Sequence, residues 1–533
     1  MTDSVLTSEV GESEEKGVGY TTVAGDDLPT VRVEKPGPGD GGKSPPPPEA
    51  PAGTPGAQRR RVFFVLLGAA FFFAAFFAPN PGPAVDPMGE AFALTPEGKM
   101  AVGLFLFAAT WWIAEVIPIG VTAIAIGVLQ AVFLIRPART AFTDFMDPSV
   151  WFIFGSLLFG MVFTKTGLTR RLAYKMLTVV GERTSMIYLG CFTLTAALTL
   201  IMAHTAVAAT VFPLLMAIYG LYTDDPEPTR FGKGLFMGMA FVAGAGSIIT
   251  LLGAARGAVA IGFYNQITGG NIGFFELSFF MFPVGVLMTF LLWGYMMLYY
   301  PPERKTIPGL RERAGKLHEN LGPITRDEVL ALGLVLVAIV LLSLRNFVPA
   351  LEDIDKSAII LGAGILFFVF RIITIDDLEK TSWNIVLLFG GAMSLGFCLW
   401  ETGAASWMAI HWLNMFENAH WMLFVMGIAF FVMLMTNFIM NVAAIAITMP
   451  VALVMAPYLG VAPEVILFAS LVVAGMPFLF LIGAAPNAIA YTSNQFTIKE
   501  FFVAGVPASI LLLVVLAVFV WLVWPAMGMA ILT

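Results

Sequence analysis

The chain has 533 residues, of which 58% are hydrophobic and 12% are charged, whereas about 25% of the residues of a soluble domain are charged. Its apolar residues lie in continuous runs of roughly 15 to 20 residues, long enough to cross a bilayer as helices, which argues against the alternating pattern of an outer-membrane barrel. The two cysteines are too few for a disulfide framework, and nothing in the sequence, with its net charge of −7, suggests a nucleic-acid partner. The composition predicts an all-α polytopic membrane protein.

The N-terminal residues 1–58 are rich in proline, glycine, aspartate and glutamate and show no apolar periodicity. Such a segment buries too little apolar surface to offset the entropy of ordering it, so we expect a disordered tail. Three arginines, Arg59 to Arg61, then precede the first apolar run, residues 62–78. Because basic residues at the start of a transmembrane helix stay in the cytoplasm, the tail is predicted to be cytoplasmic. Three apolar runs within residues 59–139 predict the first transmembrane helices.

Two long stretches of the chain, residues 140–300 and 372–533, share three features in the same order. The features are a Thr-Gly pair, an apolar arm with a polar tip that returns through a proline, and an apolar segment interrupted by glycine. Their spacing along the chain is nearly constant, which predicts an internal duplication. The paired features are Thr166-Gly167 and Thr402-Gly403, Pro213 and Pro450, and Leu252–Ala258 and Ile482–Ala488.

A charged loop, residues 301–326, separates the two halves, and its excess of lysine and arginine predicts a cytoplasmic location. Two apolar runs within residues 327–371 lead into the second half. The last run ends the chain without a basic tail, so we expect the C-terminus outside and the two halves in opposite orientations. Inverted repeats are typical of secondary transporters, whose substrate and ion sites lie near the membrane midplane where helices break. Three basic residues of the first half are expected to anchor it at the membrane surface: Lys165, Arg170 and Arg171.

The sequence supplies candidate breaks in both halves. Residues 185–219 and 421–458 each combine an apolar arm, a small polar tip and an apolar return, which is the pattern of a re-entrant hairpin. The glycines around Gly253 and Gly483 fall within apolar segments, where a helix can unwind. Freed amides at a helix start attract anions, and freed carbonyls coordinate small cations. Two hairpin tips facing two unwound segments would therefore make a binding site.

Several segments of the chain have a recognisable pattern. Trp111–Ala123 contains Trp-Trp-x-x-Glu-x-Ile-Pro, and three further segments are Gly167–Ala173, Phe389–Gly391 and Ala485–Ile489. These segments resemble the divalent anion:sodium symporter family of di- and tricarboxylate and sulfate transporters. The resemblance runs from about residue 62 to the end of the chain.

The resemblance implies about 11 transmembrane helices and two re-entrant hairpins in two inverted repeats. It also implies a homodimer in which a scaffold, here residues 59–139 and 327–371, carries a transport domain that moves as an elevator. The family's hairpin tips bear Ser-Asn-Thr, which bind substrate carboxylate and sodium together. In this chain those positions fall on Ala203-His204-Thr205 and on Met440-Asn441-Val442, and the family's Gly-Thr-Pro-Pro-Asn loops fall on Gly253–Gly257 and Gly483–Asn487.

Two residues of this set have side chains that can bind an anion or a proton, Arg256 and His204. A guanidinium at membrane depth is costly unless it is paired or hydrated, and the fork of Arg256 suits a carboxylate, sulfate or sulfonate. The alternative for Arg256 is a structural salt bridge. His204 is a candidate for substrate contact or for carrying a coupled proton, and its alternative is a hydrogen-bonded histidine that holds the hairpin tip.

The predicted substrate-binding residues are His204, Thr205, Arg256, Asn441, Val442 and Asn487. If sodium is the coupling ion, the predicted ion-binding residues are Thr199, His204, Gly253, Thr436, Asn441 and Gly483. We expect no transition-metal site and no cofactor other than the coupling ion.

The sequence therefore predicts a multi-pass plasma (inner) membrane protein that acts as a secondary active transporter of a small, di- or tricarboxylate-like anion, with sodium as the expected coupling ion. The alternative within transport is a proton-coupled carrier or exchanger for sulfate, sulfonate or another organic acid. An alternative of another class is a transport-inactive membrane sensor or scaffold. An enzyme is not expected, because the two halves contain no acid/base pair or nucleophile constellation.

Overall fold

The computed structural model describes residues 55–85, 91–223, 227–345, 347–416, 420–438 and 440–532. The chain divides into two units, residues 1–60 and 61–533, and the description below concerns the second unit. The predicted disordered tail lies outside the described residues up to residue 54, and the first described helix is α1 (Pro55–Phe77).

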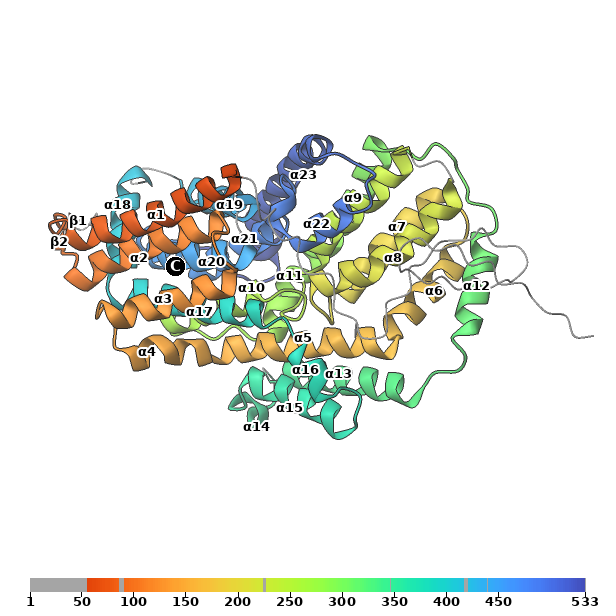
Figure 1. Cartoon of the computed structure of the whole chain (residues 1–533), viewed down its shortest axis with the longest axis horizontal. Helices are drawn as coiled ribbons and strands as arrows, with labels where there is room; N and C mark the ends of the chain where they lie inside the picture. The colour runs from red at the N-terminus through yellow and green to blue at the C-terminus, as the bar shows by residue number, and fades with distance from the viewer. Residues whose placement is uncertain are drawn as a thin grey trace, which may run out of the picture. The chain divides into compact units, whose positions relative to one another are not determined.

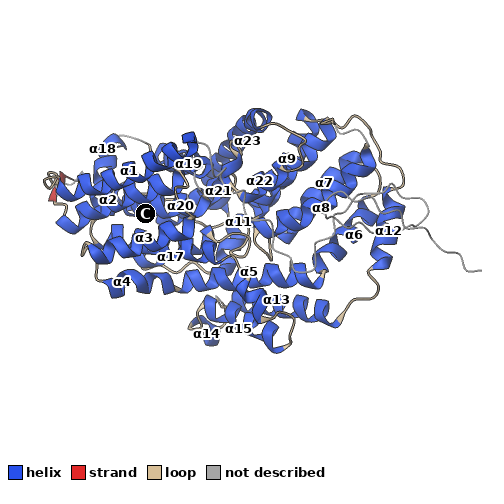
Figure 2. Cartoon of the chain, in the orientation of Figure 1, coloured by secondary structure: helices blue, strands red, loops and turns tan. Residues whose placement is uncertain are grey.

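The described chain is almost entirely helical (Figure 2), with a two-stranded antiparallel ribbon in which Ala84 lies opposite Phe92. Local signals start the helices that follow the ribbon. Thr95 caps α2 by accepting a hydrogen bond from Gly98 N over 2.9 Å, and Pro118 immediately precedes α3. The elements before the first repeat are β1 (Ala84–Val85), β2 (Ala91–Phe92), α2 (Pro96–Ile113), α3 (Ile119–Val132), α4 (Ala138–Thr143) and η1 (Asp144–Met146).

The same order of helices occurs twice along the chain (Figure 1). The first series is α5 (Pro148–Thr166), α6 (Leu168–Val180), α7 (Thr184–Leu198), α8 (His204–Tyr222), α9 (Arg230–Gly246), α10 (Arg256–Thr268) and α11 (Phe274–Tyr299). The second series is α17 (Trp383–Glu401), α18 (Ala404–Phe416), α19 (Trp421–Phe438), α20 (Asn441–Tyr458), α21 (Pro463–Ala474), η2 (Leu481–Gly483), α22 (Ala485–Tyr491) and α23 (Ile498–Val518), followed by η3 (Phe519–Val523) and α24 (Trp524–Ala526).

The two Thr-Gly pairs of the sequence occupy equivalent turns in these series. Gly167 ends α5 with a φ of 83°, and Gly403 follows α17 with a φ of 74°, a left-handed conformation that side chains with a Cβ atom rarely adopt. In the first series α9 packs against α7 and α8, and in the second α21 packs against α19 and α20. The two series thus share these turns and packing pairs, and the internal duplication and the opposite orientation of the halves in the membrane stay predictions.

Five helices join the two series: α12 (Leu310–Asn320), α13 (Arg326–Leu344), α14 (Pro349–Glu352), α15 (Lys356–Val369) and α16 (Ile375–Glu379). Among the described residues, nine helices are long and apolar enough to cross a membrane. They are α1, the continuous stretch from α4 to α5, α8, α11, α13, α17, α19, α20 and the stretch from α23 to α24. Four shorter apolar helices, α3, α7, α15 and α21, accompany them.

A buried polar cluster holds α17 against α3. Arg136 is 4% exposed, and its guanidinium lies 2.7 Å from Asp144 Oδ2 and 2.8 Å from Glu401 Oε2. Gln130 Nε2 in α3 donates to Ser394 Oγ in α17 over 2.8 Å. Because the guanidinium is paired with two carboxylates, its charge can be buried between helices of a membrane protein.

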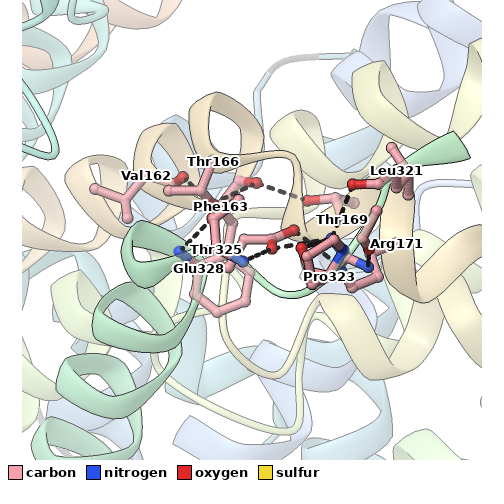
Figure 3. A network of polar contacts seen from close by, with 10 residues as sticks. Val162, Phe163, Thr166, Thr169, Arg171, Leu321, Pro323, Thr325 and Glu328 are labelled. Atoms are coloured by element: carbon pink, nitrogen blue, oxygen red, sulfur yellow. Dashed lines mark hydrogen bonds and ion pairs between the residues drawn. The ribbon is translucent and has the colours of Figure 1, made fainter.

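A second polar network joins α6 to the start of α13 (Figure 3). Arg171 binds Glu328 through two parallel contacts, Nε to Oε1 at 2.9 Å and Nη2 to Oε2 at 3.1 Å. Glu328 also accepts a hydrogen bond from Thr325 N over 2.7 Å, which completes the capping box of α13. Arg171 is thus more than a surface anchor, because its charge is paired where the two elements meet.

Glu328→Gln is expected to lower the free energy of unfolding by about 2–3 kcal/mol, because it leaves the guanidinium of Arg171 without a carboxylate in a mostly buried position. Chemical denaturation of the purified protein in micelles measures the change. The matched control is Glu312→Gln, which removes an exposed ion pair with Lys316 and should leave stability unchanged. Equal losses in the two variants would mean that the Arg171–Glu328 pair contributes no more than a surface pair.

Candidate binding site at two helix breaks

The first helix break lies between α9, which ends at Gly246, and α10, which begins at Arg256. The chain passes very close to the first hairpin tip, residues 199–203, which joins α7 to α8. A Cβ atom at Gly253 would lie 2.6 Å from the carbonyl oxygen of Thr199 and 2.7 Å from that of Ser247. Only glycine allows this approach, and the predicted residues Thr199 and Gly253 are therefore neighbours.

His204 ties the first tip to the first break. Its backbone N–H donates to the carbonyl oxygen of Gly253 over 2.9 Å, and its ring Nδ1 lies 3.1 Å from the same oxygen. Because a carbonyl oxygen only accepts hydrogen bonds, Nδ1 carries the hydrogen and Nε2 is the ring atom left for another partner. Thr250 Oγ1 adds a bond to the carbonyl oxygen of Leu200 over 2.8 Å. The imidazole therefore holds the hairpin tip by a hydrogen bond, which is the alternative predicted for His204 from the sequence. Its second nitrogen, Nε2, has no described partner.

The second break lies between α21, which ends at Ala474, and α22, with the short η2 helix inside it. The second hairpin tip, between α19 and α20, approaches it in the same way, and Ile439 of this tip lies outside the described residues. The hydroxyl of Thr436 lies 2.8 Å from Asn441 Oδ1 and 3.2 Å from the carbonyl oxygen of Ala474. Three oxygen atoms therefore gather where the second tip meets the second break.

Two asparagines hold the irregular backbone of the second break in place. Asn437 Oδ1 accepts a hydrogen bond from Leu479 N over 2.8 Å. Asn487 Nδ2 donates to the carbonyl oxygens of Pro477, at 2.8 Å, and Phe480, at 3.2 Å. A Cβ atom at Gly483 would lie 3.0 Å from the carbonyl oxygen of Thr436, so the predicted residues Gly483 and Thr436 are also neighbours.

Arg256 lies between the two breaks. It is 2% exposed, and its Nη2 donates to Ser247 Oγ in the first break over 2.8 Å. A Cβ atom at Gly475, at the start of the second break, would lie 2.7 Å from the same Nη2. Within the described part of the chain, Nη1 of Arg256 has no hydrogen-bond partner and no carboxylate lies within ion-pair distance of the guanidinium. The structural salt bridge that was the alternative for Arg256 is therefore not formed with a described residue.

The predicted site residues thus fall into two groups joined by Arg256. His204, Thr199 and Gly253 meet at the first break, and Thr436, Asn441, Gly483 and Asn487 meet at the second. Two predicted residues remain. Thr205 is half-buried and its hydroxyl makes no hydrogen bond with a described residue, and Val442, whose side chain is apolar, is 6% exposed.

Two residues without a predicted role, Ser247 and Thr250, connect the first break to Arg256 and to the first tip. Ser247 ends a glycine-rich stretch of α9, so its place at a helix break was the signal that could have found it. No feature of the sequence indicates a role for Thr250, because its hydroxyl binds the carbonyl oxygen of Leu200, which lies 50 residues earlier in the first tip.

This arrangement has the chemistry of an anion site. The helices α8, α10 and α20 all begin at the breaks or tips, where freed amides carry partial positive charge. The buried guanidinium of Arg256 adds a full positive charge. Among the described residues, no cluster of three histidine, cysteine, aspartate or glutamate side chains could hold a metal ion.

Comparison with known proteins adds a family and a fold. Residues 85–530 match the family model described as the sodium:sulfate symporter transmembrane region. A relative named sodium-dependent dicarboxylate transporter SdcS, from Staphylococcus saprophyticus, is 24% identical over 457 residues, which cover 82% of this chain and 88% of the relative. The protein of the same name from Staphylococcus aureus is 24% identical over 450 residues, covering 80% of this chain and 86% of the relative.

Two solved structures share the fold. The Alcanivorax borkumensis YdaH transporter aligns with a TM-score of 0.55 and 16% identity, covering 89% of this chain and 99% of that one. Neisseria gonorrhoeae MtrF, described with a class of antimetabolite efflux pumps, aligns with a TM-score of 0.53 and 14% identity, covering 87% of this chain and 94% of that one. At these identities the two structures inform the fold alone.

Proposed function

Because the chain belongs to the sodium:sulfate symporter transmembrane family, it is a multi-pass membrane protein and a secondary transporter, and we propose that it carries a small organic anion in symport with sodium. The observation that carries this proposal is Arg256, a buried guanidinium between two helix breaks with no acidic partner among the described residues. A buried charge of this kind is costly unless a counter-charge binds it, and an anionic substrate would be that counter-charge.

A carboxylate is the proposed acidic group of the substrate. The fork of a guanidinium matches a carboxylate with two parallel hydrogen bonds, and Arg256 uses only Nη2 on a described protein group, Ser247. The relatives are named dicarboxylate transporters, which supports the same chemistry. The hydroxyl of Thr205, in the first turn of α8, would donate a neutral hydrogen bond to the bound anion, whereas Nε2 of His204 can only accept one in this tautomer.

Sodium is the proposed coupling ion because the relatives are named sodium-dependent and because oxygen atoms gather at the second break. Those oxygens belong to Thr436, Asn441 and Ala474, and unwound backbone of this kind coordinates sodium in transporters. Of the first-half residues predicted to bind sodium, Gly253 already accepts two contacts from His204 through its carbonyl oxygen. The second half is therefore the better ion site.

Binding the anion together with sodium would lower the net charge that the two ligands carry across the membrane. Elevator-type movement, a homodimer, a plasma-membrane location with a cytoplasmic N-terminus, and the scaffold and transport boundaries remain predictions that follow from the sequence and its resemblance.

Purified protein in liposomes is expected to accumulate at least one labelled organic acid from a panel of succinate, citrate and short monocarboxylates when an inward sodium gradient is imposed. Replacing sodium by choline should reduce the initial rate by at least about tenfold, since the driving gradient and the ion contact are both lost. Sulfate and an alkanesulfonate are included in the same panel.

The other outcomes separate the alternatives. Accumulation driven by a pH gradient without sodium would replace sodium coupling by the proton-coupled alternative, in which His204 carries the proton. Exchange that needs an internal anion but no gradient would indicate an exchanger. No uptake under any of these conditions, by protein that remains folded, would overturn the proposal in favour of a membrane sensor or scaffold.

A further inference from the structure

The two halves of the site differ in chemistry, although they occupy equivalent places in the two helix series. We propose that the substrate has a single acidic group, held at the first half, and a mainly apolar remainder, held at the second. This inference rests on the proposed function and goes beyond it, because it names the number of acidic groups on the substrate and the half of the site that binds each part.

The first half has polar groups to spare. Nη1 of Arg256 meets no described acceptor, and the hydroxyl of Thr205 makes no hydrogen bond with a described residue. Nε2 of His204 does not add to these donors, because it can only accept a hydrogen bond when Nδ1 donates to Gly253. A positive charge and a hydroxyl are thus unpaired on one side of the site. One acidic group is enough to use them.

The polar side chains of the second half are already committed to the protein. Both amide hydrogens of Asn487 bind backbone carbonyls, and Asn437 binds Met433 and Leu479 through its two ends. The hydroxyl hydrogen of Thr436 points to Asn441 or Ala474. Only Nδ2 of Asn441, among the described side chains at this break, donates to no described residue, and it is a neutral donor.

The second half also lacks counterparts of the basic side chain and the hydroxyl that the first half offers to an anion. By alignment of the paired segments, Val442 stands where the first half has Thr205, and Pro486 stands where it has Arg256. A second carboxylate would therefore meet no basic side chain among the described residues of this break, and its counter-charge would be the proposed sodium, which the oxygen atoms of Thr436, Asn441 and Ala474 would hold. Losing hydration without a basic partner is unfavourable. An apolar chain in the same place would gain from burial.

Apolar side chains are more exposed at the second break than at the first, as expected if the second half binds the apolar part of the substrate. Ile482, directly before the second-break glycine, is 59% exposed, whereas its counterpart Leu252 in the first break is fully buried. Ala485 at the start of α22 is exposed and its counterpart Ala255 is half-buried, whereas Met440 and its counterpart Ala203 at the two tips are both half-buried. The second break therefore offers more apolar side-chain surface than the first, and the two tips do not differ.

The test compares acids of equal length that differ only in the second carboxylate. Thermal denaturation of the purified protein is followed in sodium buffer with butyrate against succinate, and with hexanoate against adipate. The monocarboxylate of each pair is expected to give half-maximal stabilisation at a concentration at least about tenfold lower than the dicarboxylate. Both acids should lose their effect on Arg256→Met, which separates site binding from a general effect of the acid on the micelle.

A gain-of-function variant provides the second test. Val442→Thr restores a hydroxyl at the second tip and should shift the preference of the pair by roughly fivefold or more toward the dicarboxylate, because a donor then faces its second acidic group. The matched control is Val454→Thr on the same helix, farther from the tip, which should leave the preference unchanged.

Stronger stabilisation and faster sodium-driven uptake with succinate and adipate than with the monocarboxylates would overturn this inference and leave the proposed function intact. Absence of uptake for every acid would overturn both. The same preference for monocarboxylates in wild type and in Arg256→Met would also contradict the inference, because the acidic group would then be held elsewhere.

Discussion

Arg256→Met is expected to abolish sodium-driven uptake and to leave the stability of the purified protein unchanged or higher. Methionine fills much of the same volume, so the packing against Gly475 is largely kept. The guanidinium is 2% exposed and has no described acidic partner, so its removal relieves a desolvation cost without breaking an ion pair. Initial uptake rates in liposomes should fall by at least about 100-fold, because the charge that holds the anion is gone.

Arg136→Met is the matched control for this prediction. Arg136 is also a buried arginine of a transmembrane region, but Asp144 and Glu401 pair with it. Its replacement should lower the free energy of unfolding by about 3–5 kcal/mol, since a buried carboxylate is left unpaired. Uptake that persists in Arg256→Met, or a loss of stability equal to that of Arg136→Met, would assign Arg256 a structural role.

Gly253→Ala is the second variant with a large expected effect. The new Cβ atom would lie within 2.7 Å of two carbonyl oxygens, those of Thr199 and Ser247, which belong to the backbone and cannot rotate away. The first break must therefore move, and the paired contacts of His204 with the carbonyl oxygen of Gly253 are lost. Because a displacement of about 1 Å at a binding centre can cost roughly 100-fold in rate, uptake should fall by that order.

The control for the glycine variant is Gly294→Ala. Gly294 lies within α11, where an added Cβ atom would meet nothing within 4 Å, so the change should slightly favour the helix and leave uptake within about twofold of wild type. Circular dichroism and size-exclusion profiles show whether both variants fold. Normal uptake by Gly253→Ala would mean that the close approach of the first tip and the first break is unnecessary for transport.

The positions of the two helix breaks could be predicted from the sequence, and the contacts across them could not. Apolar runs and glycines located the hairpins and both breaks, because hydrophobic length and backbone permissiveness are local properties. Thr199 and Thr436 are both predicted to bind the coupling ion, and their hydroxyls have different partners in the structure. The hydroxyl of Thr199 donates to Ala196 of its own hairpin arm, and that of Thr436 bonds across the second tip to Asn441.

Pairings between distant helices could not be predicted from one sequence. Nothing local indicates that Arg256 meets Gly475, or that Arg171, expected only as a surface anchor, pairs with Glu328 beyond the charged loop. A charge near the end of an apolar run reads as an anchor whether or not a carboxylate from another helix approaches it. Such partners depend on how helices pack, which hydrophobic patterning constrains only loosely.

The attachment of each hairpin tip to the break of its own half bears on how the protein is made. His204 binds Gly253, and Asn437 binds Leu479, so each tip finds these partners within a segment that leaves the ribosome as one continuous stretch. The first half can therefore close its hairpin during membrane insertion, before the second half has been translated. Arg256 can meet Gly475 only after the second half has been translated, because Gly475 belongs to that half.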